Sequence, residues 1–231
     1  MRTGADPAEA GAEDWLVWQL ADSAFPVGGF AHSGGLEAAA QAGLLASRDA
    51  LPRFLESGLG GLAAGAVPLL TATHADPGRI VEVDELADRF LSNHVTNRAS
   101  RQQGQALWLA VERSLGGGLL TQARRDFLAA GSPGHHAPVF GAVTRLLGLP
   151  RGTSVRLFLF TQLRGWIGAA VRLGLAGPLE AQRLQAQLGP CAEHAARRGL
   201  ELGLEDLAQT APLTDLMQGL QDRLYSRLFQ S

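Results

Sequence analysis

The chain has 231 residues, a net charge of −2 and a single cysteine, Cys191. A chain of this length can bury enough apolar surface to fold without disulfides or structural metals. All 20 basic residues are arginine, which excludes a Schiff-base lysine and the lysine of a phosphate-binding P-loop. The nearly balanced charge argues against a nucleic-acid partner or an anionic membrane surface.

The first 14 residues are mostly small and polar and lack the apolar core of a signal peptide. They predict a short mobile leader, residues 1–14, before a single domain that covers residues 15–231. No uncharged apolar run reaches the length of about 18 residues that a membrane span needs. We therefore expect a cytoplasmic protein, and the single cysteine fits a reducing compartment.

Helical periodicity dominates the chain, and the alternation typical of strands is almost absent. The predicted helices, in chain order, cover residues 15–21, 36–45, 50–76, a long segment 81–115, 122–130, 138–147, 154–175, a helix that begins at 178, then 191–207 and 213–229. Thr153 or Ser154 is expected to cap the helix that follows it. The predicted fold is an all-α single-domain bundle of about nine or ten helices.

The stretch "ADSAFPVGGFAHSGGLEAA", residues 21–39, stands between the first two predicted helices. A phosphate loop is excluded because neither a lysine nor a preceding strand is present. A nucleophile elbow is excluded because Ala31 occupies the first glycine position of G-x-S-x-G around Ser33; Ser33 instead predicts a cap for the next helix. The glycines therefore predict a turn that presents Phe25, Phe30 and His32 to another protein.

Histidine and cysteine give only weak indications of a metal site. Cys191 and His194 lie three residues apart on one predicted helix, and His135 and His136 form a second pair. Two ligands do not close a site. Burial as a small apolar residue explains Cys191, solvation explains His194, and turn or cap hydrogen bonds explain His135 and His136; the alternative is a transient metal site shared between chains. The candidate ligands are His32, His136, Cys191 and His194, and no permanently bound cofactor is expected.

Two further segments are candidates for contacts with a partner. Arg98 and Arg101 lie on one helical face with Gln102 and Gln105, which favours either a solvated surface or an interface. The last 20 residues carry a leucine stripe together with Tyr225, a residue type enriched at interfaces. This C-terminal segment either packs on its own domain or binds a partner.

Several motifs together resemble the urease accessory protein F (UreF) family. "LADSAFPVGGFAHSGGLEAA" resembles its N-terminal signature, "RASRQQG" its arginine–serine–glycine segment, "HAPVFGAVTRLLGL" one of its helix starts, and "LYSRLFQS" its C-terminal signature. The matches run in order from about Leu16 to Ser231. This chain departs from the family pattern at Gln221, where the family often has a histidine before the acidic residue.

The resemblance implies an all-α, non-enzymatic maturation factor that tends to dimerise. It implies binding to a UreD-type protein (also called UreH) and to the GTPase UreG, so that GTP, held by the GTPase, is coupled to nickel delivery into apo-urease; nickel would be handled only transiently. The implied contact residues are Asp22, Phe25, Pro26, Gly28, Gly29, Phe30, His32 and Glu37 near the dimer or GTPase face, Arg98, Ser100 and Arg101 for polar contacts, and Tyr225, Arg227, Leu228 and Phe229 for the UreD-type partner.

Two alternatives remain open at the level of sequence. One is a metal-dependent hydrolase that uses His135, His136 and His194. The other is a purely structural homodimer. Metal bound to the isolated protein would favour the hydrolase over an adaptor, and urease genes beside this one would argue against the structural dimer.

Overall fold

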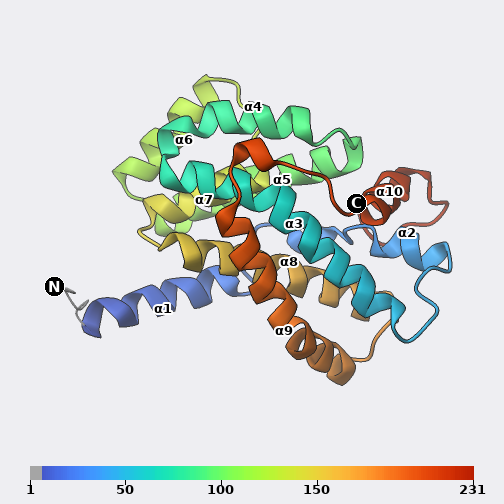
Figure 1. Ribbon diagram of the computed structural model, residues 1–231. Helices are drawn as coiled ribbons and strands as arrows, with labels where there is room; N and C mark the ends of the chain where they lie inside the picture. The colour runs from blue at the N-terminus through green and yellow to red at the C-terminus, as the bar shows by residue number, and fades with distance from the viewer. Residues whose placement is uncertain (1–6) are drawn as a thin grey trace.

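The computed structural model describes residues 7–231 of the chain, with side chains from Glu13 onward. Over these residues it has ten α-helices and no β-strand, which confirms the predicted all-α fold (Figure 1). The helices are α1 (Pro7–Ala21), α2 (Leu36–Gln41), α3 (Ala50–Ala75), α4 (Ile80–Phe90), α5 (His94–Leu115), α6 (Gly118–Ala129), α7 (His136–Leu146), α8 (Arg151–Arg172), α9 (Pro178–Glu201) and α10 (Pro212–Leu220). Four short 3-10 helices are η1 (Gly29–Ala31), η2 (Pro77–Arg79), η3 (Leu204–Asp206) and η4 (Gln221–Arg223).

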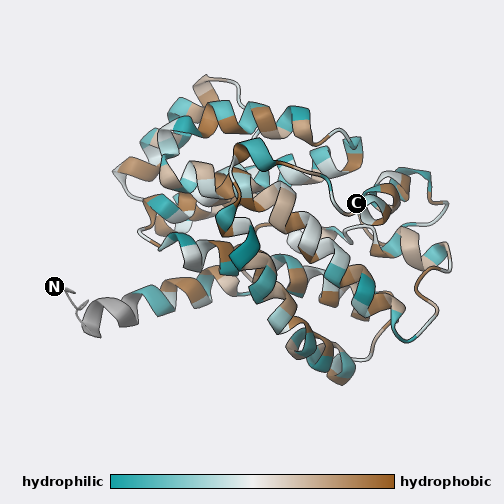
Figure 2. Cartoon of the chain, viewed as in Figure 1, coloured by the Kyte–Doolittle hydropathy of each residue, from teal (hydrophilic) through white to brown (hydrophobic). Residues whose placement is uncertain are grey.

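Helix α3 is the central element, and α7, α8 and α9 pack around it. Its inward side chains, among them Leu55, Leu59 and Leu70, are fully buried. By length and composition alone α3 could cross a membrane, but 67% of its most apolar window is buried inside the protein. Apolar and polar residues alternate along the surrounding helices (Figure 2), as expected for helices that cover a common core.

Glycine allows α7 to approach α3 closely. A Cβ at Gly141 of α7 would overlap the carbonyl oxygen of Leu70 on α3. At the same crossing, the Thr73 hydroxyl of α3 donates a hydrogen bond of 2.8 Å to the carbonyl of Pro138. The small residue here therefore serves core packing between the two helices.

The first helix begins earlier than its apolar pattern predicts. Helix α1 starts at Pro7, so that part of the predicted leader is helical, while residues 1–6 lie outside the described residues. Leu16, Val17 and Leu20 pack against the core, where α1 meets α8. The helix therefore leaves the body of the domain at its N-terminal end (Figure 1).

Several predicted boundaries are wrong, and each has a local cause. The segment 81–115 is two helices, because the Asn93 side chain accepts hydrogen bonds from the backbone amides of Val95 and Thr96 and caps α5. Conversely, α9 continues through Pro190. That proline is exposed, as is Ala186 one turn earlier, so water can reach the carbonyl that loses its donor.

Two predicted caps and the predicted C-terminal helix also differ from the structure. Gly35, not Ser33, is the N-cap of α2, and Pro150, not Thr153 or Ser154, precedes α8. Helix α10 ends at Leu220 instead of residue 229. After the single turn η4, the chain runs without α-helix to Ser231 because its amides bond to other parts of the domain.

Candidate functional site

The segment between α1 and α2, residues 22–35, folds back onto α8 and α10. Gly28, Gly34 and Gly35 adopt positive φ angles of 70°, 62° and 88°, a region that L side chains rarely occupy. A Cβ at Gly34 would overlap the indole nitrogen of Trp166 on α8. The glycines thus allow the turn that the sequence predicted, and they also allow a close approach to Trp166.

The contact residues predicted in this segment divide by exposure. Asp22, Pro26 and Phe30 are exposed, with 73% of Phe30 open to solvent. Gly28, Gly29 and His32 are half-buried. Phe25 and Glu37 are buried at 9% and 3% exposure, so the contacts that these two make are internal.

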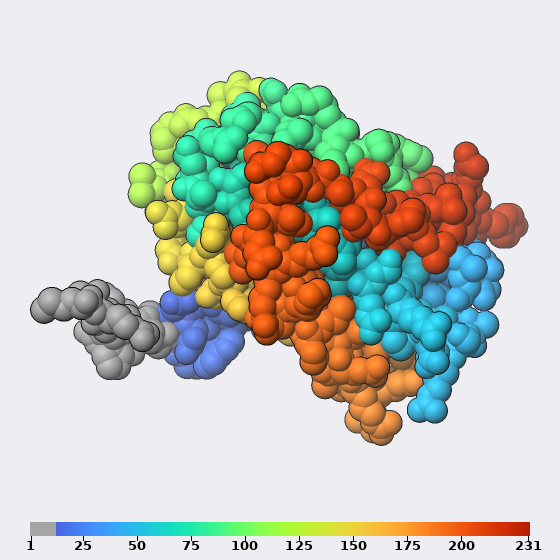
Figure 3. All heavy atoms as spheres, in the orientation of Figure 1, coloured from blue at the N-terminus to red at the C-terminus, as the bar shows by residue number. Residues whose placement is uncertain are grey.

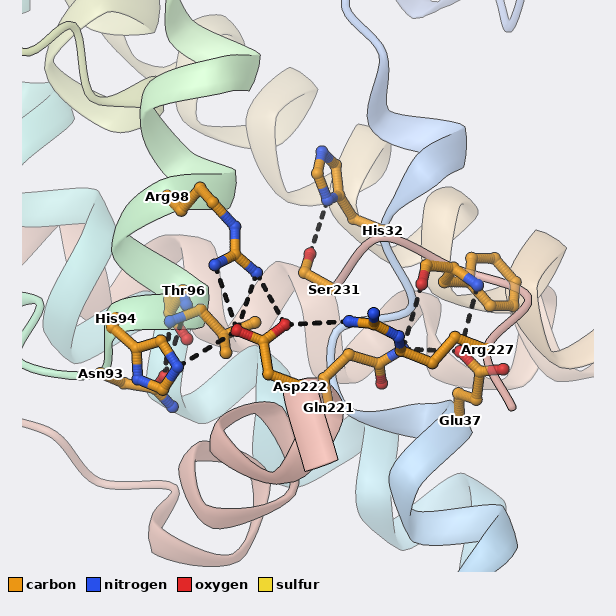
Figure 4. Close-up of polar contacts among 12 residues, drawn as sticks. His32, Glu37, Asn93, His94, Thr96, Arg98, Gln221, Asp222, Arg227 and Ser231 are labelled. Atoms are coloured by element: carbon orange, nitrogen blue, oxygen red, sulfur yellow. Dashed lines mark hydrogen bonds and ion pairs between the residues drawn. The ribbon is translucent and has the colours of Figure 1, made fainter. Parts of the chain in front are cut away.

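Glu37, on the first turn of α2, is a buried carboxylate that holds the C-terminal residues (Figure 4). Its oxygens accept hydrogen bonds from the backbone amides of Leu228 and Phe229, at 2.5 and 3.1 Å. The Gln221 side chain donates a third bond of 2.6 Å. Three donors compensate for the loss of water around this charge. Gln221 therefore supplies a neutral hydrogen-bond donor to this buried carboxylate.

Asp222 gathers three cationic or titratable side chains at the protein surface (Figure 4). Arg98 of α5 donates to both of its carboxylate oxygens, with contacts of 2.9 to 3.2 Å. Arg227 donates a bond of 3.1 Å, and His94 lies 3.2 Å away. The guanidinium of Arg98 lowers the pKa of the Asp222 carboxyl. Sequence analysis missed Asp222, although an acid five residues before Arg227 was a usable signal.

The other two residues predicted on α5 have different surroundings. The Ser100 hydroxyl accepts a hydrogen bond of 3.1 Å from the backbone amide of His136, at the start of α7. Arg101 is exposed. Ser100 is thus an internal contact between two helices, whereas Arg101 is open to a partner.

The C-terminal residues pack on their own domain and still present apolar groups to solvent. Phe229 is buried at 4% exposure, with the guanidinium of Arg172 4.2 Å above its ring, a cation–π contact. Tyr225 is fully exposed and Leu228 is 60% exposed. Of the four predicted anchors, Tyr225, Leu228 and Arg227 therefore lie at the surface.

A cavity of about 690 Å³ lies behind the 22–35 segment. Its walls come from that segment, the end of α1, α3, α4, α5, α7, α8 and the region from Ala208 to Gln218, and Ser231 also lines it. Most of the lining is apolar, and His32, His135 and His136 supply the imidazoles. This volume lies within the range of small-molecule pockets.

Two of these histidines are held neutral by their surroundings. Burial, and secondarily the charge of Arg98, lowers the pKa of His32 to about 4. Burial, and secondarily His32, lowers the pKa of His136 to about 4. The Nδ1 atom of His32 lies 2.5 Å from the hydroxyl of Ser231. Neutral imidazoles near neutral pH are the form that can bind metals.

His135 is fully buried and belongs to a structural network with α4. Its Nε2 lies 3.0 Å from a carboxylate oxygen of Asp88. Asp84, also fully buried, accepts the backbone amides of Gly134 and His135 at 2.7 and 2.6 Å. Desolvation raises the pKa of Asp84 and lowers that of His135. These contacts fix the turn that starts α7.

The candidate metal ligands are not gathered into one site. Among the described residues, no group of three or more histidine, cysteine or acidic side chains is placed to share a metal ion. His32 and His136 line the same cavity, but Cys191 and His194 lie on α9 and are absent from its lining. Burial raises the pKa of the Cys191 thiol. Within this part of the chain, the three histidines of the hydrolase hypothesis therefore do not form such a group.

Comparison with known proteins identifies the family. The family model described as UreF matches residues 8–189. "Urease accessory protein F" of Oryza sativa subsp. indica is 38% identical over 93% of this chain and 84% of that protein. The protein of the same name from Arabidopsis thaliana is 36% identical over 94% and 92%. "Urease accessory protein UreF" of Trichodesmium erythraeum is 30% identical over 94% and 97%. The chain belongs to the UreF family of urease accessory proteins, which are not enzymes.

Proposed function

We propose that this protein is an adaptor in urease maturation. It binds a UreD-type protein and a UreG-type GTPase, and it couples GTP hydrolysis by that GTPase to the delivery of nickel into apo-urease. Nickel is the cargo of the complex, and GTP is bound by the partner, since this chain lacks the lysine of a P-loop. The adaptor works in the cytoplasm as a homodimer. Membership of a urease accessory family supports the general role.

The exposed apolar end of the molecule carries the proposal. Leu213 and Leu216 of α10 are 48% and 57% exposed, and Tyr225 and Leu228, further along the same C-terminal segment, are exposed as well. This C-terminal segment lies at the surface beside α2 (Figure 3). Large apolar side chains exposed together are typical of binding surfaces. We assign this end to the UreD-type partner.

A second surface lies at the 22–35 segment. Phe30 projects from η1, and its carbonyl accepts a hydrogen bond of 2.5 Å from the Arg172 side chain. That bond holds the backbone while the aromatic ring stays exposed. Exposed Asp22, Pro26 and Arg101 supply further contact groups. We assign Phe30 and these groups to the GTPase or to the second copy of this chain.

Co-purification with each partner tests the proposal. We expect Leu216→Asp and Tyr225→Asp to reduce capture of the UreD-type protein by about tenfold or more, since a charge is placed in an apolar contact. Phe30→Asp should reduce GTPase capture, or dimerisation, instead. Leu179→Asp is the matched control, because Leu179 on α9 is also a large exposed apolar residue, with an exposed fraction of 76% between those of Leu216 and Tyr225. Full capture of the UreD-type protein by both C-terminal variants would contradict the assignment.

Point variants test this better than deletion of the C-terminal residues. A deletion of residues 225–231 would also remove buried Phe229 and two of the three donors to Glu37. An unpaired buried carboxylate would then destabilise the domain itself. Leu216 and Tyr225 are surface side chains, so the fold should persist, as helical circular dichroism can verify.

A further inference from the structure

We propose that residues 212–231, from the start of α10 to Ser231, form a lid over the cavity, closed by a polar latch centred on Glu37 and Asp222. We call this segment the C-terminal lid. The proposal concerns the mechanics of the fold and does not rest on the proposed urease role.

The lid forms one wall of the cavity. Thr214, Asp215 and Gln218 of α10 line it, and so does Ser231. The other walls come from the end of α1, helices α3, α4, α5, α7 and α8, the 22–35 segment and residues 208–211. Displacement of the lid would therefore open the cavity without moving the central helices.

Polar contacts hold the lid at several points along its length. Glu37 accepts the three bonds from Gln221, Leu228 and Phe229. Asp222 binds Arg98 across the gap to α5. At the start of the lid, the Asn93 side chain donates to the carbonyl of Asp215 at 2.8 Å.

The end of the lid is joined to the 22–35 segment by its backbone. The amide of Gln230 donates to the carbonyl of Ala31 at 2.8 Å, and the amide of Ser33 donates to the carbonyl of Ser231 at 2.5 Å. The Ser231 hydroxyl is also hydrogen-bonded to Nδ1 of His32. Opening the lid would thus release the 22–35 segment and the His32 imidazole together.

Apolar burial contributes to closure at a few positions of the lid. Met217 and Phe229 are buried and Leu220 and Leu224 pack partly buried against the core, whereas Leu213, Leu216 and Leu228 are exposed. Individual hydrogen bonds stabilise a fold only weakly, because water competes for their groups. A terminal segment that combines a few apolar contacts with many hydrogen bonds can open locally while the rest of the core stays folded.

Two measurements on the full-length protein test the lid. Hydrogen exchange measured by mass spectrometry reports opening of residues 221–231. Carbethoxylation of His136 by diethylpyrocarbonate reports access to the cavity, because His136 lines it, is only 7% exposed and makes no contact with the latch. Asp222→Asn removes the charge that binds Arg98, His94 and Arg227.

Glu193→Gln is the matched control. Glu193 of α9 also accepts two bonds from an arginine, Arg156, at 2.8 Å each, and it does not line the cavity. We expect Asp222→Asn to raise both the exchange rate and the His136 modification rate about tenfold, as for the loss of a charge-assisted bond. Glu193→Gln should leave both rates at the wild-type value.

Glu37→Gln is a second variant of nearly the same shape. It replaces one accepting carboxylate oxygen with an amide NH2 group, which cannot accept the hydrogen bonds that the lid donates to Glu37. If neither Asp222→Asn nor Glu37→Gln accelerates exchange in residues 221–231, the latch is wrong. If exchange accelerates while His136 modification stays at the rate of the Glu193→Gln control, the segment is no lid. Acceleration of both rates in either lid variant supports the proposal.

Discussion

Gly34 fixes the position of the 22–35 segment through a property that only glycine has. Its φ angle is 62°, and Trp166 fills the space where a Cβ would stand. Gly43, after α2, has a similar φ angle of 74° but open space around it. The two glycines thus separate the cost of the backbone conformation from the cost of the contact.

We predict that Gly34→Ala lowers the free energy of unfolding by about 3 kcal/mol, the sum of left-handed strain and overpacking against Trp166. Gly43→Ala should lower it by only about 1 kcal/mol, since strain alone applies. Urea denaturation followed by circular dichroism measures both values. Equal losses in the two variants would contradict the close approach to Trp166.

His136 makes stability depend on pH. Its pKa is about 4 in the folded protein, against an ordinary value of 6.5, so below pH 6.5 the unfolded chain binds a proton that the folded chain does not. The stabilisation is complete above pH 6.5 and is lost as the pH falls towards 4. Between pH 7 and pH 5 this group should remove about 2 kcal/mol.

In the variant His136→Gln, the free energy of unfolding should fall by about 2 kcal/mol less than in the wild type between pH 7 and pH 5. Comparison with the wild type cancels the contributions of the other titrating groups. His194→Gln, which alters an exposed residue of α9, should keep the wild-type pH dependence. Parallel stability curves for His136→Gln and the wild type would show that His136 is not held neutral.

At the scale of helices, the crossing of α3 and α7 depends on a missing side chain. Gly141→Ala should destabilise the protein by about 2 kcal/mol or more, because the new methyl group meets the backbone of Leu70 and the Thr73 hydroxyl. Gly60→Ala, in α3 but facing open space, should stabilise it by up to about 1 kcal/mol through helix propensity. Thermal denaturation should give a lower melting temperature than the wild type for Gly141→Ala and a higher one for Gly60→Ala. A shift in the same direction for both variants would contradict this view of the crossing.

Helices were predictable where an apolar period is long, and their ends were not. The α4–α5 break depends on the Asn93 side chain turning to cap the next helix. The end of α10 depends on Glu37, a residue more than 180 positions away, which takes the amides of Leu228 and Phe229. The leucine stripe predicted a helix there because local periodicity contains no information about such distant acceptors.

At the scale of the whole molecule, the cavity could not be predicted, because its walls come from helices α1, α3, α4, α5, α7, α8 and α10 and from loop residues that are distant in sequence. The family, and the turn formed by residues 22–35, could be. Among the predicted contact residues, Phe30, Arg101, Tyr225 and Leu228 are surface groups, while Phe25, Glu37 and Phe229 are interior. Residue type alone marked the surface and the interior residues equally as contact candidates. Only the three-dimensional packing shows which of them a partner can reach.

Reconstitution of urease activation tests the central claim most directly. Purified apo-urease, a UreD-type protein, a UreG-type GTPase, nickel and GTP are combined with or without this chain, and urease activity is measured. An adaptor that couples the GTPase to delivery predicts activation only when the chain is present and GTP can be hydrolysed, and a strong loss with Leu216→Asp but not Leu179→Asp. Equal activation without the chain, or with a non-hydrolysable GTP analogue, would contradict that role.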